Sequence, residues 1–228
     1  MAILTRSGRA ALAAAVKAQA LHIALGAGDP DWDTQKAGAF TFSGQERIDL
    51  PHAPVSGVSV KIGATTYAAG TDYTADGLTG RITRLTAGAI PAGAQVNVAY
   101  TRLHPVENPN ASGLLAEVGR RIVDEVEFVR PDAAGAIVVP TGRYAVSATP
   151  TNHLFVRVRF DFTDASTATI REQALIMGTV TDPALPPGQR FFLPADLDDP
   201  GILLMLQHSV PIVRQPSTRE TFEFVVTF

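Results

Sequence analysis

The sequence predicts a mainly β protein with one or two short helices. Along the 228 residues, short segments in which apolar and polar residues alternate are bounded by glycine, proline, asparagine or aspartate. That pattern is typical of half-buried strands joined by turns. In the block 46–103 the segments are spaced about 8 to 12 residues apart and show no helical periodicity, which is typical of a small β-sandwich.

The first element expected is a helix over residues 6–20. Thr5 or Ser7 serves as its N-cap, and its residues are strong helix formers. Leu12 and Val16, four positions apart, would form its buried face. Basic residues followed by an alanine-rich stretch are also compatible with a signal peptide. The helix is favoured, because alanine is weakly hydrophobic and Lys17 ends the stretch after seven residues.

After the helix, a short apolar strand over 21–25 ends in the turn-forming stretch 26–33. Block 46–103 then contains at least two hairpins and a last strand with Val96, Val98 and Tyr100 on one face. A second short helix is expected after residue 110, with Asn110 or Ser112 as its cap. Further strands are expected over 135–147, 152–162 and 219–228.

Two of these strands have one clearly apolar face. In 152–162 one face carries Leu154, Val156, Val158, Phe160 and Phe162, and the other carries Arg157, Arg159 and Asp161. Such a strand is half-buried in an antiparallel sheet. The last strand has an apolar row of Phe222, Phe224, Val226 and Phe228, so the end of the chain is expected to dock in a sheet.

Residues 166–178 place an arginine beside a glutamate in a strand. Strict alternation puts Glu172 on an apolar face with Ala168, Ile170, Ala174 and Ile176, where an unpaired carboxylate is costly. Its expected partner is an arginine from a neighbouring strand, with Arg120, Arg121 and Arg143 as the candidates. Arg171 is expected on the opposite face, at the surface or in a subunit contact. The pair is interpreted as a structural salt-bridge element.

No pattern of residues indicates catalysis, a metal or a cofactor. Asp29, Asp31 and Asp33 have the alternate spacing that opens a calcium loop, but Thr34 and Phe40 stand where that loop needs glycine and glutamate. A capped surface turn is the favoured interpretation. The five histidines are scattered, and no Gly-x-Ser-x-Gly motif occurs. No catalytic, cofactor-binding or metal-binding residue is assigned.

Composition excludes further classes of function. The net charge is −3 and no basic run occurs, which argues against nucleic-acid binding. The absence of cysteine excludes disulfides and thiol chemistry. No apolar run approaches the roughly 20 residues that membrane insertion requires.

Several long stretches resemble a structural protein family of tailed bacteriophages, associated with tail fibres and baseplates. They are "LTRSGRAALAAAVKAQALHIALGAGDPDWD", "LLAEVGRR", "TNHLFVRVRFDFTDASTATIREQALIMGTV", "LPPGQRFFLPADLDDPGILLML" and "RETFEFVVTF". The stretch 53–101 is similar to small β-sandwich domains appended to phage tail proteins. The resemblance implies an antiparallel β-sandwich-type outer domain, made of 1–45 and 104–228, with 46–103 as an inserted small Ig-like β-sandwich. A compact domain whose ends lie close together can be inserted at a surface loop.

The resemblance also implies a function. The expected role is a non-enzymatic baseplate or tail-tip adaptor that joins the tail to fibres or other peripheral proteins. Its expected partners are other tail proteins, including the tail fibre, and further copies of itself as a trimer or hexamer. The virion tail is the expected location, after assembly in the host cytoplasm. A receptor-binding module and a sugar hydrolase remain alternatives, and the candidate structural or assembly residues are Arg171, Glu172, Arg157 and Arg159.

Overall fold

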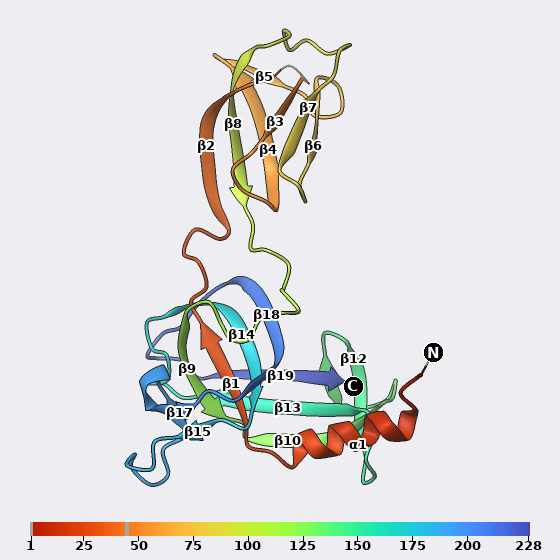
Figure 1. Cartoon of the computed structure of the whole chain (residues 1–228), viewed down its shortest axis with the longest axis vertical. Coiled ribbons are helices and arrows are strands. Elements are labelled where there is room, and N and C mark those ends of the chain that lie inside the picture. The colour runs from red at the N-terminus through yellow and green to blue at the C-terminus, as the bar shows by residue number, and fades with distance from the viewer. Residues whose placement is uncertain (1, 44–45) are drawn as a thin grey trace. The chain divides into compact units, whose positions relative to one another are not determined.

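The computed structural model describes residues 2–43 and 46–228 and divides the chain into two compact units (Figure 1). Unit 1 comprises Met1–Gly28 and Glu107–Phe228, and unit 2 comprises Asp29–Val106. Antiparallel strands are the main element of both units. The prediction of a mainly β fold is confirmed.

The first element of unit 1 is helix α1 (Arg6–Lys17). The hydroxyl of Thr5 accepts a hydrogen bond from the Gly8 amide at 3.1 Å and caps the helix, as predicted. The helix ends three residues earlier than expected. Its buried residues are Ala13 and Val16, whereas Leu12 is 47% exposed. The predicted buried face was therefore wrong at Leu12, because the helix meets the core with small Ala13 one position further along.

Unit 1 contains two five-stranded antiparallel sheets. The first has the order β16 (Phe191–Phe192), β9 (Glu117–Ile122), β1 (Leu21–Gly26), β14 (Thr169–Met177), β18 (Ile202–Val213). The second has the order β11 (Ile137–Val139), β12 (Gly142–Val146), β10 (Glu125–Pro131), β13 (His153–Phe160), β19 (Glu220–Thr227). A small ladder of β15 (Val180–Thr181) and β17 (Leu197–Asp199) completes the unit, and the 3-10 helix η1 (Pro194–Asp196) directly precedes β17.

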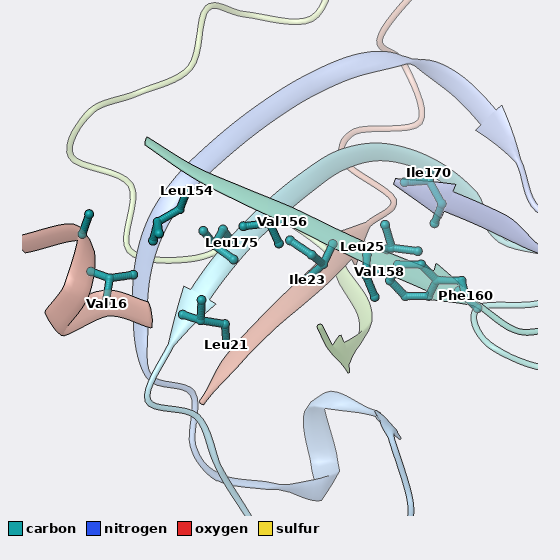
Figure 2. Packing of buried hydrophobic residues seen from close by; sticks show 12 residues of the cluster. Val16, Leu21, Ile23, Leu25, Leu154, Val156, Val158, Phe160, Ile170 and Leu175 are labelled. Atoms are coloured by element: carbon teal, nitrogen blue, oxygen red, sulfur yellow. The ribbon is translucent and has the colours of Figure 1, made fainter. Parts of the chain in front are cut away.

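The main core of unit 1 takes side chains from both sheets and from α1. Figure 2 shows the apolar side chains of β1, β13 and β14 gathered together, with Val16 of the helix at one end. The row from Leu154 to Phe160 is buried as predicted, but Phe162 is 41% exposed because β13 ends at Phe160. The apolar row of β19 packs against the same core, so the last strand is docked as expected. Apolar faces from two sheets meeting in one core are typical of a β-sandwich.

The second predicted helix does not form. Residues 108–110 form a turn, in which the Asn108 side chain accepts a hydrogen bond from the Asn110 amide at 2.9 Å. The chain then runs irregularly to β9. Asparagine offers the backbone this alternative to a helix, and the amides of Leu115 and Ala116 are occupied by a side-chain carboxylate.

Unit 2 consists of a four-stranded and a three-stranded antiparallel sheet. The first has the order β2 (Thr34–Thr41), β8 (Gln95–Arg102), β4 (Val55–Ile62), β5 (Thr65–Tyr67). The second has the order β3 (Arg47–Asp49), β7 (Arg81–Arg84), β6 (Tyr73–Asp76). One apolar cluster collects residues from both sheets, including Val60, Ile82, Val96, Val98 and Tyr100.

Unit 2 is longer than the predicted block 46–103. It begins at Asp29, because β2 pairs with β8 from Thr34↔Arg102 to Thr41↔Gln95. The sequence did not predict this strand, because its central residues Ala37, Gly38 and Ala39 are small. Strands are recognised in a sequence by their branched and aromatic side chains. The predicted boundary at residue 45 lies outside the described residues.

Candidate functional site

Glu172 lies close to the segments of unit 1 that adjoin unit 2 in sequence, and it is almost completely buried. It is 2% exposed and sits on β14, opposite Gly26 of β1. A Cβ atom at Gly26 would lie only 2.7 Å from Glu172 Oε2. Only glycine at position 26 leaves room for this carboxylate, so the two positions are sterically matched.

The Glu172 carboxylate is held by main-chain amides and a histidine. Oε2 accepts hydrogen bonds from the Leu115 amide at 3.0 Å and from the Ala116 amide at 3.4 Å. His208 Nε2 lies 3.6 Å from Oε1. The His208 amide in turn donates to Glu107 Oε1 at 2.9 Å. Several donors therefore satisfy the buried carboxylate, as a buried charge requires.

The predicted arginine partners of Glu172 were wrong. Arg120 pairs with Glu117, Arg121 pairs with Asp164, and Arg143 donates to the carbonyl of Gly135. The segment 107–116 runs close to β14, and its amides, instead of an arginine side chain, bind the Glu172 carboxylate. The sequence contains no pattern for this, because a main-chain donor can come from any residue except proline.

Arg171 is half-buried rather than on an open surface. Its Nη1 donates to the carbonyl of Ala27 at 3.3 Å. The Ala27 amide donates to the Ala116 carbonyl at 2.7 Å. Arg171 thus binds, at Ala27, the segment of unit 1 that leads into unit 2. Glu172 binds, at Leu115 and Ala116, the segment of unit 1 that follows unit 2. We call Gly26, Ala27, Leu115, Ala116, Arg171, Glu172 and His208 the junction cluster.

The predicted strand phase is correct over only part of β14. Ala174 and Ile176 pack with Ala24, whereas Ile170 joins Leu175 in the main core. The pairing of β14 with β18 shifts register between Ile170 and Glu172. A bulge changes the face on which following side chains lie, and a strict alternation rule cannot include it.

Arg157 and Arg159 lie on the exposed side of the second sheet. Arg157 stands between Glu125 of β10 and Glu223 of β19 and forms ion pairs with both. The Arg159 amide donates to the Asp124 carboxylate at 2.6 Å, and its side chain is exposed. The structure does not bring these arginines into the junction cluster.

Sequence reasoning missed a second polar group, centred on Arg120. Its guanidinium makes two 2.8 Å hydrogen bonds to the Glu117 carboxylate and donates to Thr179 Oγ1 at 2.7 Å. Residues three apart in a regular strand point to opposite faces, so a Glu117–Arg120 pair is not expected. The irregular pairing of β9 with β1 at Leu25/Gly26 makes it possible. Burial and the nearby Arg120 charge lower the pKa of His22 from its usual 6.5 to about 4.

A third polar group closes the loop after β13. Arg121 Nη1 donates to Asp164 Oδ2 at 2.5 Å, and the buried Arg214 donates to the Asp161 and Asp164 carbonyls. The hydrogen bond from Arg219 holds the pKa of Asp161 below its usual range. Of these residues, Asp161 was considered in the sequence as a side chain on the polar face of its strand, and Arg121 as a candidate partner of Glu172.

The three aspartates of residues 29–33 act within unit 2. Asp29 accepts the Asp31 amide at 2.9 Å, which confirms the capped turn. Arg102 Nη2 lies 2.7 Å from Asp29, and Lys36 lies 3.0 Å from Asp31. His104 lies 3.3 Å from Asp33. Within residues 2–43 and 46–228, no group of three or more potential ligand side chains is arranged to hold a metal ion.

One family model matches most of the chain. Residues 1–43 and 93–228 match the family described as "Baseplate wedge 3 tail fiber network component". The chain belongs to this family. It is therefore a structural component of a phage baseplate and tail fibre network, and membership implies a place in the virion tail and association with other tail proteins. No curated protein matches the chain. No helix in the described part is long and apolar enough to span a membrane.

The baseplate family match omits residues 44–92 but includes β2 and β8. These strands pair with each other, and the Phe42 amide donates to the Ala94 carbonyl at 3.1 Å just beyond the ladder. Residues on either side of the unmatched segment, Phe42 and Ala94, are therefore adjacent in space. The part of unit 2 that the family model includes contains this two-stranded ladder.

Proposed function

We propose that the chain is a non-catalytic adaptor of the baseplate, which joins other tail proteins to fibres or peripheral proteins. In this proposal unit 1 forms the body that neighbouring tail proteins contact. Unit 2 is a domain inserted into it, and several copies act together in the tail after assembly in the host cytoplasm.

The junction cluster is the observation that carries the proposal. Two of its side chains, those of Arg171 and Glu172, bind main-chain groups of the two segments that lead to and from unit 2. A carboxylate used in this way is unavailable as a general acid or base, because catalysis requires access to a substrate. Arg171 and Glu172 therefore fix the two connecting segments to β14. Fixing both segments suits a domain that carries another domain inserted between them.

The inserted-domain arrangement has separate support in the geometry of unit 2. Its first and last segments lie together, since the Asp33 amide donates to the Arg102 carbonyl at 2.7 Å. Adjacent ends are the condition for inserting a compact domain without disturbing its host.

The receptor-binding alternative has less support. It would be favoured by aromatic side chains gathered on the surface of unit 2. Tyr73 and Tyr100 are each 2% exposed and belong to the apolar core of unit 2, and Tyr67 packs against it.

The proposal is tested by assembling tails with a shortened chain. A chain in which a short glycine-serine linker replaces residues 29–106 is supplied during tail assembly in place of the full chain. We expect the shortened chain to be present in the tails by mass spectrometry, and the tails to lack fibres or peripheral proteins by electron microscopy.

Arg81→Ala, an exposed change within unit 2, is the control and leaves tails complete. Complete tails from the shortened chain would contradict the adaptor role. Hydrolysis of peptidoglycan or polysaccharide by the purified chain, lost in Glu172→Gln, would contradict the non-catalytic role.

A further inference from the structure

One end of unit 1 carries a basic hollow. Arg6 and Arg9 of α1 and Arg130 at the end of β10 line a hollow of about 590 Å³, together with Asn152 and His153. Arg9 Nη1 donates to the backbone oxygen of Phe228 at 3.3 Å. Within the described residues, none of the three arginines has an ion pair with a carboxylate side chain.

The fold itself does not explain these arginines. Arg6 is the first residue of α1 and Arg9 lies in its first turn, and that turn contains no acidic residue. The N-terminus of a helix carries a partial positive charge, so cations there are unfavourable. The hollow therefore concentrates positive charge from two sources, the guanidinium groups and the helix end. Such a site favours a carboxylate from outside the unit.

The β15–β17 ladder carries the complementary charge. Asp182, Asp196, Asp198 and Asp199 lie on or beside this ladder, and the Asp182 amide donates to the Asp196 carbonyl at 2.9 Å. Three of the carboxylates accept main-chain amides, from Ala184, Leu193 and Gly201. Across residues 2–43 and 46–228 none of the four forms an ion pair. The only cation in residues 179–201, Arg190, pairs with Asp124.

The two charged surfaces lie at opposite ends of unit 1. Figure 1 shows both chain termini and the start of α1 at one end of the unit, and β15 and β17 at the other. An acidic end and a basic end on one molecule cannot meet within a single copy. They can meet between two copies in the same orientation.

We propose that the acidic β15–β17 ladder of one copy docks in the basic hollow of the next copy. The contact joins two different surfaces, so it is heterologous and continues from copy to copy as a ring or an open row. Carboxylates of the ladder pair with Arg6 and Arg130, and the pairing sets the orientation of neighbours. This inference rests on the proposed function only in requiring several copies side by side.

The test uses charge reversal in the full chain. One variant carries Arg6→Glu with Arg130→Glu, and a second carries Asp198→Arg with Asp199→Arg. We expect the unchanged chain to self-associate with rising concentration in sedimentation velocity, and to dissociate as salt screens the contact. Each variant alone remains a monomer over the same range. Circular dichroism and thermal unfolding confirm that both variants are folded.

Mixing the two variants decides which surfaces are in contact. Within either variant the two ends carry like charges, whereas between the variants a reversed hollow faces a reversed ladder, and an unchanged hollow faces an unchanged ladder, with opposite charges. We therefore expect the two variants to associate with each other through both of these contacts, and a chain with all four changes to self-associate again. Lys61→Glu, an exposed change in unit 2, is the control and leaves association unchanged.

Three outcomes would overturn the inference. They are a full chain that is monomeric at every concentration, association that persists in each of the two variants alone, and loss of association in the variant with Arg6→Glu and Arg130→Glu but not in the variant with Asp198→Arg and Asp199→Arg. The last outcome would show that the hollow binds another surface. None of them bears on whether the chain enters tails, so failure here is distinguishable from failure of the adaptor role.

Discussion

Unit 1 and unit 2 are both built from antiparallel sheets, but they bury different chemistry. Seven of the eight buried polar or charged residues in the described chain belong to unit 1: His22, Arg120, Arg121, Asp164, Glu172, Thr179 and Arg214. Unit 2 contributes only Asp72, which accepts the amides of Ala68 and Ala89. The core of unit 2 is otherwise apolar.

The difference follows from the lengths of the connections. Unit 2 joins its strands largely through short turns, whose main-chain groups bond to one another. Unit 1 contains long irregular segments, such as 107–116 and 182–190, most of whose amides and carbonyls find no strand partner. Buried main-chain groups must be paired, and charged side chains supply the pairs. Buried charge in this protein is thus a sign of irregular chain being held in place, and is poor evidence for catalysis.

Removal of unit 2 is expected to have the largest effect. The two apolar clusters have no members in common, so each unit should unfold as a separate cooperative element. A chain that joins Gly28 to Glu107 through a short glycine-serine linker should lose one of two calorimetric transitions and keep the other. A shortened chain without any cooperative transition would show that unit 1 depends on unit 2.

Within unit 1, Arg120→Ala should be the most damaging single substitution. The change leaves Glu117, which is 15% exposed, without its cation in a buried site, at a cost of about 3 to 5 kcal/mol. The matched change in unit 2 is Arg81→Ala, which removes an exposed ion pair with Asp49. Denaturant unfolding should show a large shift for the unit 1 transition and no measurable shift for Arg81→Ala. Similar shifts for both would contradict the contrast between the units.

Acid should destabilise unit 1 through His22. Its pKa is about 4 in the folded chain and 6.5 when unfolded, so the unfolded state binds more protons between these values. Above about pH 6.5, His22 therefore does not change the free energy of unfolding with pH. As pH falls from 6.5 toward 4, protonation of His22 in the unfolded state lowers the free energy of unfolding. The full difference corresponds to about 3 kcal/mol.

His22→Leu removes this titration, and also two buried ring nitrogens without hydrogen-bond partners in the described structure. The variant should match the parent near pH 7.5 and exceed its stability near pH 4. Parallel pH dependence of the two proteins in urea unfolding would show that His22 does not titrate in this way.

The junction cluster should give a smaller effect than Arg120. Glu172→Ala leaves the Leu115 and Ala116 amides without their acceptor, but both residues lie on an exposed segment that water can reach. We expect a loss of about 1 to 3 kcal/mol, and less for Arg171→Ala, which removes one long hydrogen bond.

Gly26→Ala sharpens this prediction. The added methyl group meets the Glu172 carboxylate, so the substitution should destabilise the parent more than it destabilises Glu172→Ala. Chemical denaturation of the two single variants and the double variant measures the coupling. Additive losses would mean that the carboxylate does not lie over Gly26.

Periodicity in the sequence was sufficient to predict the apolar rows of β13 and β19 and the apolar face of β8, and local residue types predicted the turn at Asp29 and a helix cap at Thr5 or Ser7. Each depends on residues close in the chain, where strand or helix geometry decides which side chains share a face. The burial of Glu172 was also predictable, because its strand neighbours are apolar. The extent of unit 2 was not, since β2 consists largely of small residues and is recognisable as a strand only through its pairing with β8.

The sequence by itself determined that this protein is mainly β and that a carboxylate is buried in the alternating stretch 166–178. Only the tertiary structure decided what holds that carboxylate. Its partners are amides from a segment about 57 positions earlier in the chain, and a bulge moves Ile170 to the other face. Every residue except proline has a main-chain donor, so residue type does not identify which amide will bind. A bulge moves every later side chain of the strand to the opposite face. Contacts of this kind are determined by how distant segments pack, and local pattern contains no record of them.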